Sequence, residues 1–210
     1  RLRKTFGATV IEAPADIAVQ EEVDALFASI RETSGRLDVL VNNAVIQGVG
    51  HALVDTPRAL LEEVFRVNVY GAYVCAQGAA RLMVAQKSGA IVNIGSNTAE
   101  RAILNRTAYV ASKAAIDGLS RAMAVELGPH GIRVNEVIAG YIRTERWDVL
   151  AEGVAERRHR NIPLRAEASG SDIADAVLFL ASDAAARING ARLVVDGGSL
   201  AQLYPADCDA

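Results

Sequence analysis

Apolar runs and helical patterns alternate along this chain of 210 residues. The runs are rich in β-branched residues and predict strands at "ATVIEAP", "LDVLVNN", "GAIVNIG", "IRVNEVI" and "ARLVVDGG". The helical spacing of apolar positions predicts helices over 20–34, 57–86, 107–128, 143–160 and 171–182. Strands without polar alternation are buried on both faces, and helices between them supply the crossovers of a parallel sheet. The pattern therefore predicts an α/β fold with a doubly wound parallel sheet and helices on both faces.

The order of the elements also predicts where ligands bind. Right-handed crossovers bring the loops after all strands to one edge of the sheet, and ligands bind at that edge. Polar residues and a glycine follow the predicted strand ends there, namely Asn42, Asn43, Ser96 and Gly140. We find no repeat or linker, so we expect a single domain over 1–210. The first residues, "RLRKTFG", resemble the end of a helix, and we expect the first strands of the sheet to be missing from this chain.

Composition narrows the classes of function. The net charge of −3 has both signs interspersed, which argues against a nucleic-acid partner. The two cysteines lack the spacing of a disulfide framework, and His51, His130 and His159 share no metal-ligand spacing, so we expect no metal site and a reducing, cytoplasmic setting. No apolar run reaches the length of a membrane span, and we expect no membrane partner.

Two predicted helical segments, 66–84 and 108–126, are rich in Ala and Gly and have weak polar faces. Such helices are buried on more than one side. One side can face the sheet and the other a second subunit, which predicts a homo-oligomer, a dimer or a tetramer. The alternative is a thick core within one chain.

Tyr109 and Lys113 form the first candidate for chemistry. Residues four apart in a helix lie on one face, so this phenol and ammonium can reach one ligand. A positive charge favours the phenolate and makes a tyrosine a usable proton donor and acceptor. Ser96 at a strand end and Asn68 in the preceding helix are expected at the same edge.

Several ordered segments carry a resemblance to the short-chain dehydrogenase/reductase family and its NAD(P)-dependent oxidoreductases. They are "ADIAVQEEV", "LDVLVNNA", "VNVYGAY", "IVNIGS", "YVASK", "GIRVNEVIAGYIRT" and "LVVDGG". The resemblance covers nearly the whole chain and implies a Rossmann-like fold that binds NAD or NADP. It also implies a small-molecule substrate in which an alcohol and a carbonyl are interconverted.

The resemblance implies a role for each of the four candidates. Tyr109 would exchange a proton with the substrate oxygen, and Ser96 would hold that oxygen by a hydrogen bond. Lys113 would bind the nicotinamide ribose, and Asn68 would anchor a water for proton transfer. Structural alternatives remain: a serine that caps a turn, an interior asparagine that satisfies backbone groups, and a lysine that reaches solvent from an apolar helix.

The resemblance also implies cofactor contacts. Besides Tyr109 and Lys113, the matching positions are Asp16 and Ile17 beside the adenine, Asn42 and Ala44 along the adenosine ribose, and Ile142 and Thr144 near the nicotinamide amide and the phosphates. Asp16 is equally well explained as a helix N-cap. The residues that would distinguish NAD from NADP follow a second strand that we do not find, so the preference stays open.

The sequence departs from the family pattern at three places. No glycine-rich turn precedes the first strand, which leaves two explanations: a fragment, which we favour, or a shortened relative that has lost dinucleotide binding. Val45 stands where a glycine is usual in the family, and Ala139 replaces a proline, which leaves two interpretations: adapted loops or a lower cofactor affinity.

The resemblance implies that residues 141–170 occupy the region that forms a substrate lid in the family. The arginines of this lid either attract an anionic substrate or form a solvated helix face, and Trp147 either covers the substrate or fills the lid. We expect a sugar or polyol substrate first and a 3-oxoacyl thioester second. The alternative function is a catalytically silent binding or scaffold protein with the same fold.

Overall fold

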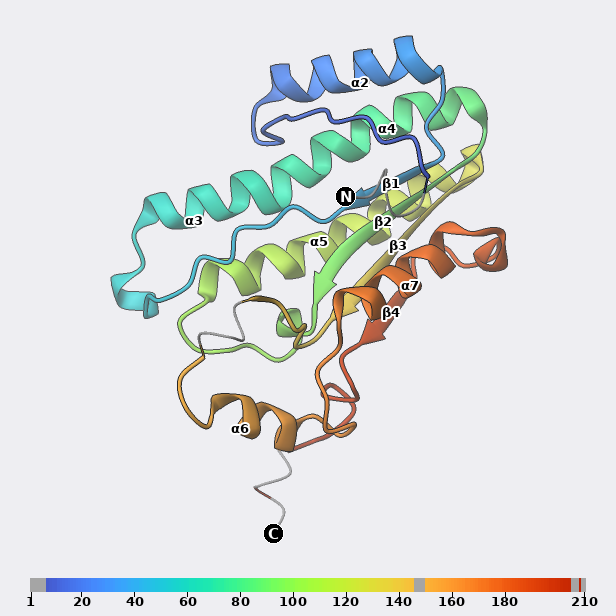
Figure 1. The fold of residues 1–210 in the computed structure, drawn as a ribbon. Helices are drawn as coiled ribbons and strands as arrows, with labels where there is room; N and C mark the ends of the chain where they lie inside the picture. Colours follow the sequence, from blue (N-terminus) through green and yellow to red (C-terminus); the bar gives the residue numbers. More distant parts are fainter. Residues whose placement is uncertain (1–6, 146–149, 205–207, 209–210) are drawn as a thin grey trace.

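The computed structural model describes residues 7–145, 150–204 and 208. Its long helices are α2 (Gln20–Ser34), α3 (Arg58–Phe65), α4 (Ala72–Gln86), α5 (Thr107–Leu127), α6 (Val154–Asn161) and α7 (Gly170–Ala181) (Figure 1). Its strands are β1 (Val39–Asn42), β2 (Gly89–Ser96), β3 (Ile132–Ala139) and β4 (Arg192–Val195). Shorter turns are η1 (Leu53–Asp55), η2 (Arg66–Gly71), η3 (Asn97–Ala99), η4 (Gly128–His130) and η6 (Asp183–Ala185). The predicted α/β fold is confirmed.

The strands form one parallel sheet in the order β1-β2-β3-β4. Asn42 pairs with Asn93, Ser96 pairs with Ala139, and Ala139 pairs with Val195. Because all strands are parallel, their carboxyl ends lie at one edge of the sheet, where the sequence predicts the ligand site.

Helices cover both faces of the sheet. On one face, α4 and α5 pack against β2 and β3, and α2 lies on the outside of α4 (Figure 1). Their core joins Val23 and Phe27 of α2 to Met83 of α4 and to Ile91 and Val134 of the sheet. On the other face, α7 packs its buried Ala176 and Leu180 against Val92 and Val137. Successive strand residues point to opposite faces, which is why strands buried on both sides carry no polar alternation.

Local sequence signals set several helix ends. Gly35 follows α2 with a left-handed φ of 65°, and its N–H bonds to the carbonyl of Arg31. At the start of α7, the Ser169 side chain accepts a hydrogen bond from the Asp172 N–H, and the Asp172 side chain accepts one from the Ser169 N–H. The predicted helix 57–86 is one continuous helical segment, in which the π-helical η2 joins α3 to α4.

Two expectations from the pattern are wrong. Residues 8–13 form no strand, because strands are stabilised by pairing and the sheet ends at β1, which leaves Val39 and Val41 exposed at its margin. Within the predicted helix 143–160, α6 begins only at Val154. The preceding Gly153 has a left-handed φ of 72°, a conformation that a right-handed helix does not include. Residues 146–149, which include Trp147, lie outside the described residues.

Among the described residues, no helix combines the length and the apolar character of a membrane span. The same residues contain no group of three or more His, Cys, Asp or Glu side chains arranged to hold a metal ion.

Candidate active site

The candidate site lies at the carboxyl edge of the sheet, where β2 and β3 end side by side. Gly140 follows β3, and its N–H bonds to the carbonyl of Val195 in β4 at 3.0 Å. A Cβ on Gly140 would lie 2.7 Å from the Cα of Asp196, so only glycine allows this approach. Helix α5 crosses the same edge and contacts β2, β3 and η3. The strand ends and the first turns of α5 are thus brought together.

Tyr109 and Lys113 lie one turn apart near the start of α5, as the sequence predicts. The Nζ of Lys113 is 5.9 Å from the centroid of the Tyr109 ring, over its face. Nζ also donates a hydrogen bond of 2.7 Å to the carbonyl of Ile94 in β2. The Lys113 side chain is only 5% exposed, so the alternative in which it reaches out to solvent is wrong. Burial lowers the pKa of Lys113 to about 8, against the opposing effect of the Glu136 carboxylate.

Ser96 ends β2 and is buried at the same edge. Its Oγ lies 2.9 Å from Oγ1 of Thr98 and accepts a hydrogen bond from the Thr98 N–H at 3.3 Å, which caps η3. The hydroxyl therefore has the capping role that we gave as its structural alternative. Capping uses only part of a hydroxyl's donor and acceptor capacity, so a contact with a substrate oxygen is compatible with it.

Asn68 is 2% exposed and sits in the π-helical turn η2. Its Nδ2 donates to the carbonyl of Ile46 and to Oγ of Ser112, both at 2.9 Å, and its Oδ1 accepts from the Ile46 N–H at 2.7 Å. The side chain thus satisfies backbone groups of the loop after β1 and ties that loop to α5. The water contact that the resemblance implies for Asn68 stays a prediction.

The hydrogen-bond donors at the start of α5 fit the nicotinamide ribose of a dinucleotide. A lysine ammonium has three N–H donors, and the described residues use one of them, on Ile94. Two donors are left for ribose hydroxyls, next to the face of the Tyr109 ring. Lys113 and Tyr109 are therefore suited to hold a nicotinamide ribose.

At the predicted binding site for the adenosine end of the cofactor, fewer side-chain groups are free to bind a ligand. Nδ2 of Asn42 is already bonded to the carbonyl of Ala72 (3.1 Å) and to Oδ1 of Asn93 (2.9 Å). Ile17 packs onto Gly71, where an added Cβ would lie 2.7 Å from its Cδ1. Ala44 is exposed in the loop after β1.

Asp16 is exposed at the turn before α2. Its carboxylate accepts a hydrogen bond from the Ala18 N–H at 2.9 Å and lies 3.7 Å from Arg66. The N-cap of α2 is Val19, which has no side-chain cap, so the explanation of Asp16 as the N-cap is wrong. Asp16 instead closes a local turn three residues earlier.

The loop after β3 carries the remaining cofactor candidates and begins the predicted lid. Ile142 forms a single parallel bridge with Ala168, and Thr144 is exposed. Arg143 forms an ion pair of 3.3 Å with Glu167, and the Arg158 guanidinium lies 4.8 Å from the centroid of the Tyr141 ring. Both arginines are therefore engaged with other residues of the predicted lid.

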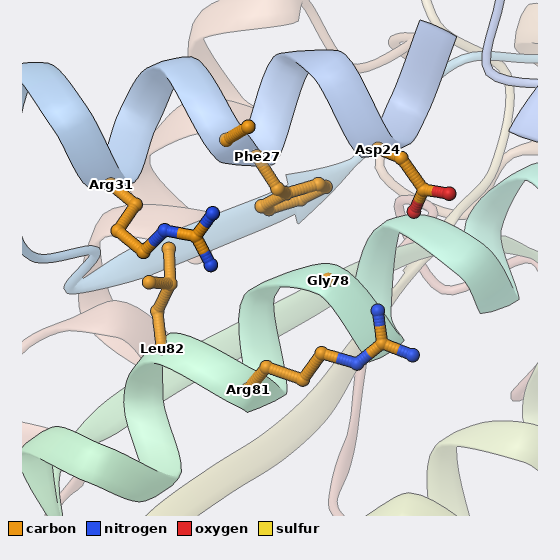
Figure 2. A pocket seen from close by; sticks show the side chains of 7 residues that line it. Asp24, Phe27, Arg31, Gly78, Arg81 and Leu82 are labelled. Atoms are coloured by element: carbon orange, nitrogen blue, oxygen red, sulfur yellow. The ribbon is translucent and has the colours of Figure 1, made fainter. Parts of the chain in front are cut away.

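Two hollows of the described surface lie away from these residues. One is between α2 and α4, lined by Asp24, Phe27, Ala28, Arg31, Gly78, Arg81 and Leu82 (Figure 2). The other lies beside the end of β4 and includes Glu100, Glu167 and Asp196. Neither is lined by Tyr109 or Lys113. The candidate site therefore rests on converging side chains and strand ends.

The sequence analysis missed Glu136, a carboxylate in the middle of β3 that is 1% exposed. Burial and, second, the Asp117 carboxylate raise the pKa of Glu136 to about 7, while nearby cations lower it. The signal was available, because a single acidic residue interrupts the apolar run "IRVNEVI". Buried carboxylates are rare enough that such an interruption marks a candidate functional residue.

The chain is similar to known oxidoreductases over most of its length. A family model described as enoyl-(acyl carrier protein) reductase matches residues 1–199. The chain is 37% identical over 203 residues to L-rhamnose 1-dehydrogenase (NAD(P)(+)) of Sphingomonas sp. (strain SKA58), which covers 95% of this chain and 80% of that protein. It is 36% identical to 3-oxoacyl-(acyl-carrier-protein) reductase FabG of Staphylococcus aureus (strain Mu50), over 93% of this chain and 79% of that protein.

A solved structure of gluconate 5-dehydrogenase from Burkholderia cenocepacia, in complex with NADP and tartrate, superposes with a TM-score of 0.85. The two are 32% identical, and the match covers 90% of this chain and 74% of that one. The Rossmann-like fold is thereby confirmed. The resemblance carried by the motifs is confirmed as well: the chain belongs to the short-chain dehydrogenase/reductase family, whose members here are NAD(P)-dependent oxidoreductases acting on CH–OH groups.

Proposed function

We propose that this protein interconverts an alcohol and a ketone or aldehyde, with Tyr109 exchanging the proton at the substrate oxygen. The observation that carries the proposal is the position of the Lys113 ammonium, which is 5.9 Å from the centre of the Tyr109 ring and is held by the Ile94 carbonyl, two residues before Ser96. A fixed cation over a phenol favours its phenolate form and so supports proton exchange at neutral pH.

Each of the four candidate residues has a separate role in the proposed reaction. The Ser96 hydroxyl orients the substrate oxygen and stabilises the charge that develops on it. The Tyr109 hydroxyl gives or takes the proton at that oxygen. The two remaining donors of Lys113 bind the ribose hydroxyls, and Asn68 keeps the loop after β1 against α5. NAD or NADP supplies the hydride chemistry when bound. Ile142 and Thr144 would contact its nicotinamide side, and Asp16, Ile17, Asn42 and Ala44 its adenosine side.

For the substrate we propose a sugar or polyol, and a 3-oxoacyl thioester as the second candidate. The first follows the similarity to an L-rhamnose 1-dehydrogenase and a gluconate 5-dehydrogenase, and the second the similarity to a 3-oxoacyl-(acyl-carrier-protein) reductase. Residues 141–170 would act as the lid within a single domain over 1–210.

We further propose a cytoplasmic homo-oligomer, a dimer or a tetramer. Tyr70 and Tyr73 are exposed on η2 and α4, and Val125 is 78% exposed on α5. Large apolar side chains on the outer faces of these helices are the type of surface that a second subunit covers.

The test is a screen of sugars, polyols and 3-oxoacyl thioesters with NAD(H) and NADP(H), followed at the nicotinamide absorbance. For a substrate that turns over, Tyr109→Phe should lower kcat/KM by about 10²–10⁴-fold, because the proton route is lost. Tyr204→Phe is the matched control, since it removes a hydroxyl from a tyrosine that is 57% exposed and lies outside the proposed subunit interface, and its rate should be unchanged. A Tyr109→Phe rate close to that of the unsubstituted protein contradicts the proposal. The scaffold alternative predicts no turnover and no saturable change in NADH or NADPH fluorescence.

A further inference from the structure

Glu136 is a buried charge that the proposed chemistry does not use. It lies in β3 between Val134 and Ile138, which point to the same face of the sheet and are fully buried. Neither of its carboxylate oxygens forms a hydrogen bond with a described residue. Burying a carboxylate without such bonds costs free energy unless nearby charge compensates it. Arg192, Lys113 and Arg121, in that order, supply the compensating positive charge and lower the pKa of the Glu136 carboxyl.

Gly95 of β2 makes room for this carboxylate. A Cβ added at Gly95 would overlap Oε1 of Glu136 and would lie 2.8 Å from its Cδ. The carboxylate therefore rests directly on the Gly95 backbone. The carbonyl of the preceding residue, Ile94, accepts the hydrogen bond from Lys113 Nζ. The Lys113 ammonium and the Glu136 carboxylate thus contact adjacent residues of β2, in the protein interior and next to Ser96.

The other charged groups around Glu136 come from α5, β4 and η3. On α5, Asp117 and Arg121 form an ion pair of 2.6 Å, and Arg192 of β4 lies 3.2 Å from Asp117. Arg192 also pairs with Glu100, just after η3. Both arginines therefore have carboxylate partners of their own.

Among the described residues, Lys113 has no carboxylate within ion-pair distance, and the Glu136 carboxylate, which packs on the same stretch of β2, raises the pKa of Lys113 against the effect of burial. Burial alone favours the neutral amine, and a nearby negative charge favours the ammonium. The two side chains are both almost fully enclosed, so water screens their interaction little.

We propose that Glu136 is a positioning residue that keeps Lys113 in its ammonium form, and that Gly95 is required to admit its carboxylate. The effect of Glu136 on catalysis rests on the function proposed above, because that function requires a positively charged Lys113 next to the Tyr109 ring. Without the carboxylate, Lys113 loses its proton at a lower pH, and the cation over the phenol disappears.

The proton on Lys113 can be followed directly by NMR. The chain has only three lysines, Lys4, Lys87 and Lys113, so protein made with isotope-labelled lysine gives few side-chain signals. Lys113→Arg assigns the buried one by its disappearance. We expect the Lys113 signal to titrate near pH 8 in the unsubstituted protein, and Glu136→Gln to lower this midpoint by about 1–3 units. Glu136→Asp, which retains a charge farther from β2, should lower it less.

The matched control is Glu126→Gln, which removes the same charge from an exposed position on α5 and should leave the Lys113 midpoint in place. Should Glu136→Gln fail to fold, Gly95→Ala gives the same test, because it displaces the carboxylate without removing it. An unchanged Lys113 midpoint in the folded variant overturns the proposal.

The titration needs neither cofactor nor substrate, so it separates this inference from the proposed function. A lowered midpoint in a protein without oxidoreductase activity supports the inference and contradicts the function. In an active protein, the alkaline limb of the kcat/KM profile for Glu136→Gln should move to lower pH with the Lys113 midpoint. A lower rate with an unmoved limb contradicts a role through Lys113.

Discussion

The β2–α5 side of the candidate site and its β1–α2 side are built differently. On the β2–α5 side, Ser96 and Lys113 are enclosed, and their polar atoms are held by backbone and neighbouring side chains. On the β1–α2 side, Ala44 and Asp16 are exposed, and the side chain of Asn42 is bonded within the protein. Side chains that are held in place before the ligand binds are suited to catalysis, because binding then costs little free energy for ordering them.

The difference follows from which elements carry the residues. Strand β2 lies inside the sheet, and α5 is packed along it, so their side chains have few alternatives. Strand β1 is at the margin of the sheet, and the residues after it belong to a loop that the Asn68 side chain fastens at Ile46. Substitutions on the β2–α5 side should therefore change rates, and those on the β1–α2 side should change stability or affinity.

After the loss expected for Tyr109→Phe, the largest effect is expected at Ser96. Ser96→Ala removes the hydroxyl that orients the substrate oxygen, and kcat should fall by about 10²–10³-fold, as for other single donors to a developing oxyanion. Thr98→Ala is the matched control, because it removes the hydroxyl partner of Ser96 but keeps the Ser96 hydroxyl itself. Its kcat should stay near that of the unsubstituted protein. If both variants lose activity equally, Ser96 serves only to cap η3.

The sequence predicted the fold and the catalytic candidates because both depend on local signals. Apolar runs give the strands, and the i, i+4 spacing gives the pairing of Tyr109 with Lys113, which α5 reproduces. Long-range polar contacts leave no such signal. Nothing local indicates that Asn68 bonds to Ile46, or that Gly95 faces Glu136, since these pairs lie 22 and 41 positions apart in the chain.

The next-largest effect is expected at Asn42, where a substitution should lower the stability of the fold. Asn42→Ala leaves the carbonyl of Ala72 and the buried Oδ1 of Asn93 without this donor, and the free energy of unfolding should fall by about 1–3 kcal/mol. Urea unfolding measures it. Asn43→Ala, at the exposed neighbouring position, should change the same free energy by less than about 0.5 kcal/mol. Equal stability of the two variants would contradict the structural role of Asn42, and with it the contrast between the two sides.

The smallest effect is expected at Asp16, where two variants separate a turn from a ligand contact. Asp16→Asn keeps an acceptor for the Ala18 N–H but loses the charge next to Arg66, so the free energy of unfolding should change by less than about 1 kcal/mol. Asp16→Ala also loses the turn hydrogen bond, which adds about 0.5–1.5 kcal/mol. If the carboxylate contacts the adenosine side of the cofactor, both variants should weaken NADH or NADPH binding by up to about tenfold, or about 1.4 kcal/mol, in a fluorescence titration. Unchanged cofactor affinity in Asp16→Asn together with lower stability in Asp16→Ala assigns Asp16 to the turn before α2 alone, because only the alanine variant removes the acceptor that this turn requires.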